Sequence, residues 1–585
     1  MADRIKKKLN NPFISSVLLN ALALLVSLCV FKPFFEENDD AFLSLIAEGA
    51  YGTGEIHLIY SNVILGSIYN YLYAAFPAVR WHTVLQYAFM FIAFTALTYV
   101  IRSKRPFVHN LFMGSDPITT LLVLSTFYEA YVSLQYTKTS ALISAIGYIL
   151  LLYGACMRTA GKPEIKKTAL NTLEATGIVL LIYGMLLRDS SFLLASLMIL
   201  PLGLYEFVST IRRYDRKAVR IFLFTFAPVL IWFLATRAVD LRAYETDSGW
   251  KSFMEYNEAR MKLQDYRYDL LDYNKYDSRL EALGISENDA YMYLTWQFGD
   301  DTVLDIAKMR ELTENAPSRW TLVSCFKALA QHIYSDVLIF DPLIPGMLFF
   351  LLCAYMALRG RKDRNRLFVL LSQLVILCGI LVYYEYSGRW SHRIVFAALL
   401  VFTVSIVWFV LCGDTCNENE YGEHAYAALL ITVFCAAVLL GNRLDYNRYI
   451  REMPDYDSFF AEIAENKDTL YIGDTFTFQY KYKYEVFKPY AEGSLDNFVT
   501  VGSWFVNSPV TKRITQLYGY SNPLRALAGA DDEGAADKGP VILVDNMSAD
   551  KKLTYINEHY AGSGETKSWQ NIGDEYGLKM YVLKP

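Results

Sequence analysis

Long apolar runs separated by short polar or basic stretches fill most of the first 440 positions. A helix needs roughly 20 mostly apolar residues to cross the hydrocarbon core of a bilayer, and about eleven runs approach that length. The predicted spans are Phe13–Phe35, Val84–Ile101, Ile118–Tyr136, Ser140–Met157, Ala169–Leu187, Phe192–Ile211, Val219–Thr236, Pro342–Leu358, Leu367–Tyr384, Ile394–Cys412 and His424–Leu440. The pattern predicts a mostly α, polytopic α-helical membrane protein.

Basic residues between the runs predict the orientation. Lys6, Lys7 and Lys8 precede the first run, and further clusters of arginine and lysine follow alternate spans, around 102–105, 158–167, 212–220 and 359–366. Cytoplasmic loops carry an excess of these residues. We therefore expect a cytoplasmic N-terminus and a multi-pass protein of the plasma membrane. The last inner loop, 413–422, is acidic and departs from this pattern.

One apolar stretch, Ile56–Phe76, is long enough to span the membrane, but a span here would move every later basic cluster to the outside. Ser61, Asn62, Ser67 and Asn70 give the stretch a polar side. We therefore predict a helix that lies on the outer surface of the membrane.

Two regions are too polar to lie in lipid and are expected on the outer side. The insert at 240–341 has helical periodicity over Trp250–Leu271 and Asp289–Thr313. The tail at 442–585 alternates helical pieces with short strand-like runs, at Thr469–Ile472, Phe498–Val501, Val541–Asp545 and Lys579–Leu583. The predicted organisation is a transmembrane domain at 1–441, with its first outer loop at 36–83 and the helical insert at 240–341, and then a small extracytoplasmic α/β domain at 442–585.

Composition narrows the function classes. The 585 residues are 54% hydrophobic and 20% charged, against about 45–50% and 25% in soluble domains. The net charge of −5 offers no basic footprint for nucleic acid. The chain has no P-loop lysine, dinucleotide glycine fingerprint or HExxH pair, which argues against ATP-driven transport. Few cysteines and no eukaryotic targeting signal favour a bacterial plasma membrane.

An acidic segment, Glu36-Glu37-Asn38-Asp39-Asp40, follows the first span directly. Charges at the membrane interface cost little, and carboxylates near a helix N-terminus are stabilised by the helix dipole. From composition alone, a structural interpretation of this segment is therefore favoured.

The wider context favours a functional interpretation. The stretch NDDAFLSLIAEGAYGTGEIHLIYSNVILGSIYNYLYAAFP resembles the start of GT-C glycosyltransferases, the superfamily of protein O-mannosyltransferases, aminoarabinose transferases and arabinosyltransferases. Their first outer loop carries an acidic pair directly after the first span, matched here by Asp39-Asp40. His57 falls near the family's His-Pro-Pro position, but this chain has His-Leu-Ile there, which is unlike the mannosyltransferase subgroup.

The resemblance implies an enzyme that moves a sugar from a polyprenyl-phosphate carrier to an acceptor hydroxyl of a cell-envelope glycan, glycolipid or protein, with inversion. The hydroxyl needs a base within hydrogen-bond reach. The resemblance points to Asp39 as this catalytic base and to Asp40 as a second catalytic carboxylate. Hard oxygen ligands suit Mg²⁺ or Mn²⁺, so Asp39 and Asp40 are also the candidates for holding a divalent cation.

Basic residues on the outer side are candidates for binding the lipid phosphate, because the leaving phosphate needs cationic partners. They are His57, Lys138, Arg188, Arg389, His392 and Arg393. Arg389 and Arg393 are four residues apart and would share a helix face. Candidate sugar or acceptor contacts in the insert are Trp250, Tyr256, Arg260 and Trp296. For all of these, interfacial packing and snorkelling are the alternative interpretation.

Two other classes stay open. A lipid-linked polysaccharide polymerase or ligase would depend on outer arginines and histidines and would not need the acidic pair. A non-enzymatic transporter of lipid-linked glycans would carry charges within its spans, and Glu129 is the main such residue. In the tail, Gly502-Ser503-Trp504 is interpreted as a strand-end turn and not as a second active site.

Overall fold

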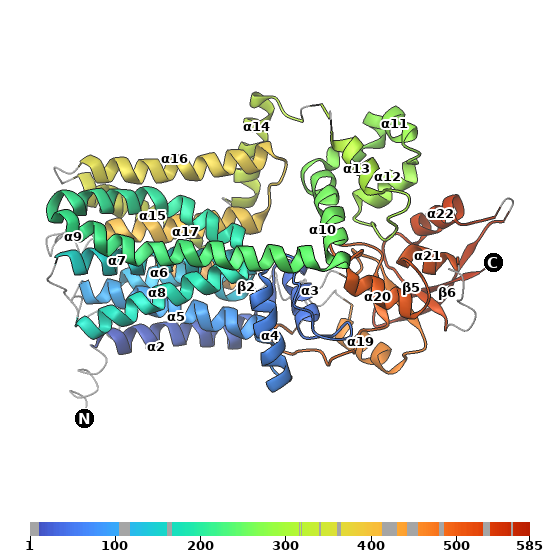
Figure 1. The fold of residues 1–585 in the computed structure, drawn as a ribbon, viewed down its shortest axis with the longest axis horizontal. Helices are drawn as coiled ribbons and strands as arrows, with labels where there is room; N and C mark the ends of the chain where they lie inside the picture. The colour runs from blue at the N-terminus through green and yellow to red at the C-terminus, as the bar shows by residue number, and fades with distance from the viewer. Residues whose placement is uncertain are drawn as a thin grey trace.

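The computed structural model consists of a long helical bundle with a smaller α/β body at one end (Figure 1). It describes residues 11–104, 117–160, 166–314, 316–317, 319–337, 341–359, 364–411, 430–441, 454–478, 485–530, 539–562 and 565–584. The described chain begins at the far end of the bundle, and the C-terminus lies in the α/β body. We call the bundle end nearest the α/β body the domain end.

Within the described ranges, eight helices are long and apolar enough to cross a membrane. They include α2 (Pro12–Val26, extended by a π-turn to Phe31), α5 (Trp81–Lys104), α7 (Tyr136–Ala160), α8 (Lys167–Leu187), α9 (Asp189–Thr246, which supplies two spans), α16 (Arg364–Tyr386) and α17 (His392–Leu411). Three shorter helices are α6 (Pro117–Phe127), α15 (Leu343–Arg359) and Leu430–Gly441. Each of the eleven predicted spans overlaps one of these segments, which confirms the polytopic prediction. Cys412, the loop 413–422 and the start of the last span lie outside the described residues.

Helix α9 folds back on itself. A straight helix would place Phe192 and Phe233 roughly 60 Å apart, yet their ring centroids are 5.3 Å apart. Arg237 also forms an ion pair with Asp189, the first residue of the helix, at 2.9 Å. The two halves therefore pack antiparallel, as the two predicted spans Phe192–Ile211 and Val219–Thr236 require.

Helix α4 (Val63–Ala75) runs across the bundle axis at the domain end (Figure 1). The Asn62 side chain caps it by accepting from the Ile64 N–H, and Tyr71 and Phe76 are exposed on one side. The helix does not run along the bundle as the predicted spans do.

The insert is helical but more broken than the sequence suggests. Its helices are α10 (Ser248–Met261), α11 (Tyr273–Ala282), α12 (Glu287–Leu294), α13 (Ile306–Thr313) and α14 (Leu322–His332). The predicted continuous helical stretch Asp289–Thr313 is wrong, because residues 295–305 leave the helix and pack against the C-terminal sheet.

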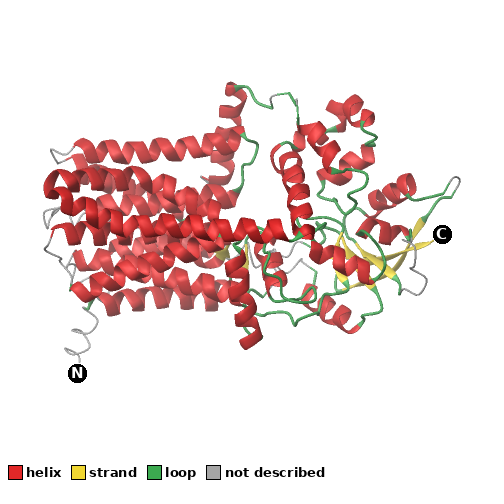
Figure 2. Ribbon diagram, viewed as in Figure 1, coloured by secondary structure: helices red, strands yellow, loops and turns green. Residues whose placement is uncertain are grey.

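The C-terminal body holds a five-stranded sheet of order β4-β3-β5-β7-β6 (Figure 2). Its strands are β3 (Leu470–Gly473), β4 (Phe498–Thr500), β5 (Val541–Val544), β6 (Ser568–Glu575) and β7 (Leu578–Lys584). The first three strands in that order are parallel, and β7 pairs antiparallel with β5 and β6. Its helices are α19 (Tyr456–Glu465), α20 (Pro509–Leu517), α21 (Pro523–Ala528) and α22 (Ala549–His559). The four predicted strands are present, and the largely exposed β6 was not predicted.

A two-residue parallel ladder lies at the domain end of the bundle. It joins β1 (Phe34–Phe35), directly after the first span, to β2 (Ser133–Leu134), directly before α7. The Glu36 N–H continues the ladder by donating to the Leu134 carbonyl. This pairing fixes the backbone from which the acidic segment starts.

Candidate active site

The acidic segment leads into helix α3 (Asn38–Ala47), whose first turn contains Asp39 and Asp40. Carboxylates are stabilised there by the positive end of the helix dipole. Because neighbouring residues on a helix point about 100° apart, the two side chains face different surroundings.

The start of α17 holds the acidic segment through two adjacent residues. Arg393 forms an ion pair with Asp39, and His392 Nδ1 lies 2.8 Å from Glu36 Oε1. The first outer loop is thereby fixed to the bundle at two carboxylates three residues apart. Arg393 is a predicted phosphate ligand, and in the structure it contacts the predicted base directly.

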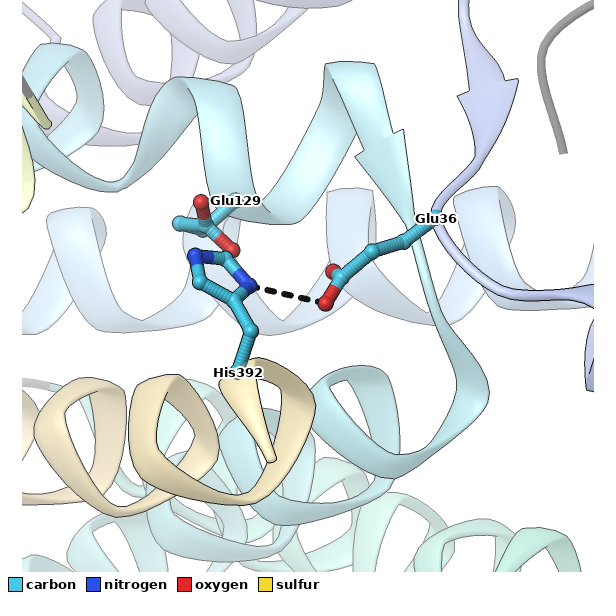
Figure 3. Close-up of side chains that lie close together, drawn as sticks. All are labelled: Glu36, Glu129 and His392. Carbon is cyan, nitrogen blue, oxygen red and sulfur yellow. Dashed lines mark hydrogen bonds and ion pairs between the residues drawn. The ribbon is translucent and has the colours of Figure 1, made fainter. Parts of the chain in front are cut away.

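His392 also belongs to a cluster of ionisable side chains. Glu36, Glu129 and His392 come from three different elements and lie close together (Figure 3). Their ligand atoms are close enough to hold an ion, but Lys138 forms ion pairs with both Glu36 and Glu129. Asp341 shares a hydrogen bond with Glu129, and burial together with Glu129 raises the pKa of Asp341 well above its usual range. Lys138 therefore supplies the cation of this cluster.

Asp40 is fully buried and does not line a cavity. Its Oδ1 lies 3.0 Å from His82 Nε2 and accepts hydrogen bonds from Gln86 Nε2 at 3.2 Å and from the Tyr136 N–H at 3.1 Å. Burial raises the pKa of Asp40, and these partners lower it only in part. Asp40 joins α3 to α5 and α7, whereas Asp39 lines a cavity and pairs with Arg393.

Asp39 lines a cavity of about 380 Å³ whose wall combines residues of the bundle end, of the insert and, through Trp504, of the C-terminal body. This volume is in the range of small-molecule sites. The lining residues are Asp39, Tyr60, Arg260, Gln264, Asp265, Tyr268, Leu294, Trp296, Gly388, Arg389, Trp390, Ser391, Arg393 and Trp504. Five of these lining residues carry a formal charge at neutral pH. They are three arginines and two aspartates, so the wall of the cavity has a net charge of +1.

The arginines are held by carboxylates and aromatic rings. Arg389 pairs with Asp265 at 3.2 Å and lies over the Tyr266 ring at 5.0 Å. Arg260, which is fully buried, lies 3.4 Å from Asp265 and 5.2 Å from the centroid of the Trp296 ring. Since one carboxylate serves two arginines, their charge is only half compensated. Such a site attracts an anion.

The other candidate residues lie elsewhere. Arg188 donates to the Tyr136 hydroxyl and lies over the Tyr60 ring at 5.3 Å, behind the cavity wall. His57 is bonded to Glu55 and stacks on Trp250 at 5.0 Å, and neither ring lines this cavity. Tyr256 lines a different cavity, between α10 and α20. The structure thus groups Asp39 with Arg260, Trp296, Arg389 and Arg393, and leaves the remaining candidates outside.

Sequence reasoning missed several lining residues. Tyr60 and Tyr268 are aromatic residues among many, Gln264 stands in a π-helical turn after α10, and Trp504 belongs to the strand-end turn after β4. No local motif marks them. The one available signal was the density of aromatic residues in the insert.

A second cavity of about 440 Å³ shares Tyr60 with the first. It lies between the segment 59–62 that precedes α4, the end of α8, both ends of α9, and α10. Acidic residues outnumber basic ones in its wall, which includes Arg188, Asp189, Arg237, Asp240, Glu245, Lys251, Glu255 and Glu258.

Comparisons with known proteins give little more. No family model matches the chain, and no curated protein matches it. Among solved structures, it is similar to the crystal structure of ArnT from Cupriavidus metallidurans bound to undecaprenyl phosphate, with a TM-score of 0.35 and 14% identity over 97% of both chains. A TM-score this low leaves the function of the chain to be decided by its own residues.

Proposed function

We propose that this protein is a membrane glycosyltransferase of the GT-C type, which moves a sugar from a polyprenyl-phosphate carrier to an acceptor hydroxyl. The observation that carries the proposal is the placement of Asp39 in a cavity with Arg260, Arg389 and Arg393 at the end of a membrane bundle. A carboxylate and a cluster of guanidinium groups are what transfer from a lipid phosphate requires.

The arginines are suited to the phosphate of the donor. Guanidinium groups bind phosphate oxygens through paired N–H donors and stay charged at all relevant pH values. Arg389 and Arg393 flank the turn at the start of α17, where a lipid phosphate would lie at the membrane edge. The Arg393 Nε atom is buried without a hydrogen-bond partner in the described structure, so it retains a donor for a substrate oxygen.

Asp39 is the proposed base. It accepts the proton of the acceptor hydroxyl as that oxygen attacks the anomeric carbon of the donor sugar from the face opposite the phosphate. The bond between the anomeric carbon and the phosphate oxygen breaks, and polyprenyl phosphate leaves with the bonding electrons. The arginines stabilise the charge that develops on the leaving oxygen, and attack from the opposite face inverts the anomeric centre.

Orientation follows from the basic loops of the sequence. The domain end, with its cavity, faces the outer side of the plasma membrane, and the N-terminus is cytoplasmic. The donor arrives within the outer leaflet. The acceptor is an envelope glycan, glycolipid or protein that reaches the cavity from the aqueous side or through the neighbouring cavity behind Tyr60.

The test is transfer from polyprenyl-phosphate sugars by the purified protein and its Asp39→Asn variant. Loss of a general base lowers the rate by about 10² to 10⁴, and asparagine keeps the size and a hydrogen-bond acceptor for Arg393. Asp40→Asn retains an acceptor for Gln86 and Tyr136, so we expect a smaller loss of kcat than for Asp39→Asn. Asp277→Asn, on the surface of the insert, is the matched control.

Equal activity of wild type and Asp39→Asn would rule out Asp39 as the base. Absence of transfer from every polyprenyl-phosphate sugar tried, with the bundle correctly folded, would contradict the proposed function as a whole.

A further inference from the structure

Two tryptophans reach the cavity from separate parts of the chain. Trp296 follows α12 in the insert, and Trp504 follows β4 in the C-terminal body. Their backbones are joined, because the Ser503 N–H donates to the Trp296 carbonyl at 3.2 Å. The wall opposite the bundle is thus built jointly by the two regions outside it.

The backbone at this junction is strained. Trp296 has φ 65° and Ser503 has φ 85°, in the left-handed region where residues other than glycine are uncommon. Each such residue costs roughly 1–3 kcal/mol and persists only where its surroundings enforce it. A Cβ on Gly502 would collide with the Trp296 carbonyl, so the close approach of the two segments also depends on that glycine.

Three further contacts enforce the conformation. Gln297 Nε2 donates to Asp474 Oδ1 at 2.8 Å, and Asn507 Nδ2 donates to the Phe298 carbonyl at 2.9 Å. The backbone of Gly299 is packed so closely on Val501 that an added Cβ would lie 2.6 Å from its carbonyl oxygen. Strain that is held this firmly, at a cavity beside Asp39, indicates a functional position for the two indole rings.

The same wall holds one buried donor and one buried acceptor without partners. Trp504 Nε1 and Gln264 Oε1 have no hydrogen-bond partner in the described structure, and their residues are 7% and 5% exposed. The other end of the Gln264 amide is fixed, because Nε2 donates to the Leu294 carbonyl at 3.1 Å. Buried polar groups are nearly always paired, so this wall is built for a ligand that both donates and accepts.

A hydroxyl group does both, and a pyranose ring combines several hydroxyls with apolar C–H faces that match aromatic side chains. We propose that Trp296, Trp504 and Gln264 form a subsite for a pyranose ring, with Trp504 Nε1 donating to a sugar oxygen and Gln264 Oε1 accepting from a sugar hydroxyl. The inference rests on the proposed function in that it places this ring beside the arginines that bind the phosphate.

The test is a binding measurement, which does not depend on turnover. Full-length protein in detergent is titrated with polyprenyl phosphate, with polyprenyl-phosphate glucose, mannose, galactose and N-acetylglucosamine, and with the lipid-free methyl glycosides of the same sugars. At least one lipid-linked sugar should bind wild type more tightly than polyprenyl phosphate does. Trp504→Phe and Gln264→Met should each reduce that gain by about three- to tenfold and leave binding of polyprenyl phosphate unchanged.

The phenylalanine variant keeps an aromatic ring against Tyr60, Phe42 and Phe505 and loses only the N–H group. Trp569→Phe removes an indole N–H in β6, where its partner is the Ala549 carbonyl, and is the matched control. If a methyl glycoside also binds and its binding also depends on Trp504 and Gln264, the subsite binds a sugar ring whether that ring belongs to the donor or to the acceptor.

The proposal is overturned if no sugar adds affinity in wild type, or if both variants keep the full gain. Loss of transfer with the sugar-dependent gain intact would overturn the proposed function and leave the subsite standing. Conversely, transfer that depends on Asp39 but shows no sugar-dependent gain in binding would leave the function standing and remove the subsite.

Discussion

At the scale of single residues, Asp39 and Asp40 show how neighbours in sequence acquire different roles. Both stand in the first turn of α3, where the dipole favours charge. Asp40 points into the bundle and is enclosed by His82, Gln86 and the Tyr136 N–H. Asp39 points into the cavity and has a single cationic partner, Arg393. Asp39 is therefore the candidate base because a substrate in the cavity can reach it, and Asp40, which is enclosed, is a positioning residue.

Arg389 provides the sharpest test of phosphate binding. Replacing it by glutamine removes a charged donor while Asp265 keeps Arg260 as a partner. A hydrogen bond to a charged group contributes about 1.5–3 kcal/mol, so the KM for the lipid donor should rise about ten- to a hundredfold with a smaller change in kcat. Arg267→Gln, on the surface of the insert, is the control. An unchanged KM would mean that Arg389 only holds Asp265.

The position of Lys138 predicts the effect of chelators. Its ammonium group pairs with Glu36 and Glu129, which with His392 form the bundle's candidate ion site. Burial opposes ionisation of Glu36, but Lys138 and His392 outweigh it and lower the pKa of that carboxyl. We expect EDTA to leave the transfer rate unchanged and added Mg²⁺ or Mn²⁺ not to increase it. A loss restored by either ion would show that a metal displaces Lys138.

At the scale of elements, the hydrophobic pattern predicts most of the fold because burial in lipid or in a sheet leaves a periodic signal. The spans, the surface helix α4 and strands β3, β4, β5 and β7 follow from it. The break at 295–305 was not predicted, although Gly299-Asp300-Asp301 and the cap Asp305 are local signals for it. Asp474 and Asn507, far along the chain, bind Gln297 and Phe298 in this segment. Strand β6 is missed because one face is open to solvent and its alternation is weak.

The site follows the same rule. The acidic segment and the basic residues Arg389 and Arg393 are local features, so the sequence shows them. The expectation that the two arginines share a helix face is wrong, because Arg389 lies in the turn before α17 and only Arg393 lies in the helix. The junction of Trp296 with Ser503, and the approach of Gln264 to Leu294, depend on segments that meet only in the folded chain. Candidates such as His57 and Trp250 are chemically suitable but are used in packing.

A histidine at the contact between α12 and α22 predicts a pH effect on stability. His559 Nε2 lies 2.8 Å from Asp289 Oδ1, with Glu558 and Asp300 as the other carboxylates nearby. Burial opposes protonation, but Asp289 outweighs it and raises the pKa of His559. Because the pKa of His559 is higher in the folded than in the unfolded chain, its protonation stabilises the folded state. This stabilisation is complete below the ordinary histidine pKa near 6.5 and is lost as the pH rises through the folded-state pKa.

Thermal melting of the full chain between pH 5.5 and 8.5 checks this contact. As the pH rises across this range, the free energy of unfolding of wild type should fall by about 1 kcal/mol relative to that of His559→Gln, as expected for a partly exposed ion pair. The variant should melt lower than wild type at pH 5.5 and close to it at pH 8.5. If the melting temperatures of the two proteins change in parallel with pH, the contact between His559 and Asp289 makes no pH-dependent contribution to stability.

At the scale of the whole molecule, the bundle and the C-terminal body are joined by a buried ion pair. Arg80, fully buried before α5, pairs with Glu48 at the end of α3 and donates to the Glu485 carbonyl. The Tyr490 N–H donates to the same Glu48 carboxylate. The C-terminal body is therefore bonded to the end of α3, the helix whose first turn carries Asp39.

The edge of the C-terminal sheet binds the segment of the insert that carries Trp296. Crevices at the carboxyl ends of parallel strands are common ligand sites in α/β sheets, but here Asp474 and Asp545 at the ends of β3 and β5 both bind Lys552, at 2.6 and 2.7 Å. Asp474 also accepts from Gln297, the residue after Trp296. The edge of the sheet thus binds a segment of the insert, and that segment presents Trp296 to the cavity.

Gln297→Leu should separate this positioning role from stability. Asp474 keeps Lys552 and the Phe476 and Thr477 N–H groups, so melting should change little, while the strained turn at Trp296 loses a restraint. The KM for the lipid-linked sugar should rise about three- to tenfold, with binding of polyprenyl phosphate unchanged. Gln516→Leu, at an exposed position of α20, is the control. If Gln297→Leu binds the sugar as wild type does, the sheet holds the insert for stability alone, and Trp296 needs no such support.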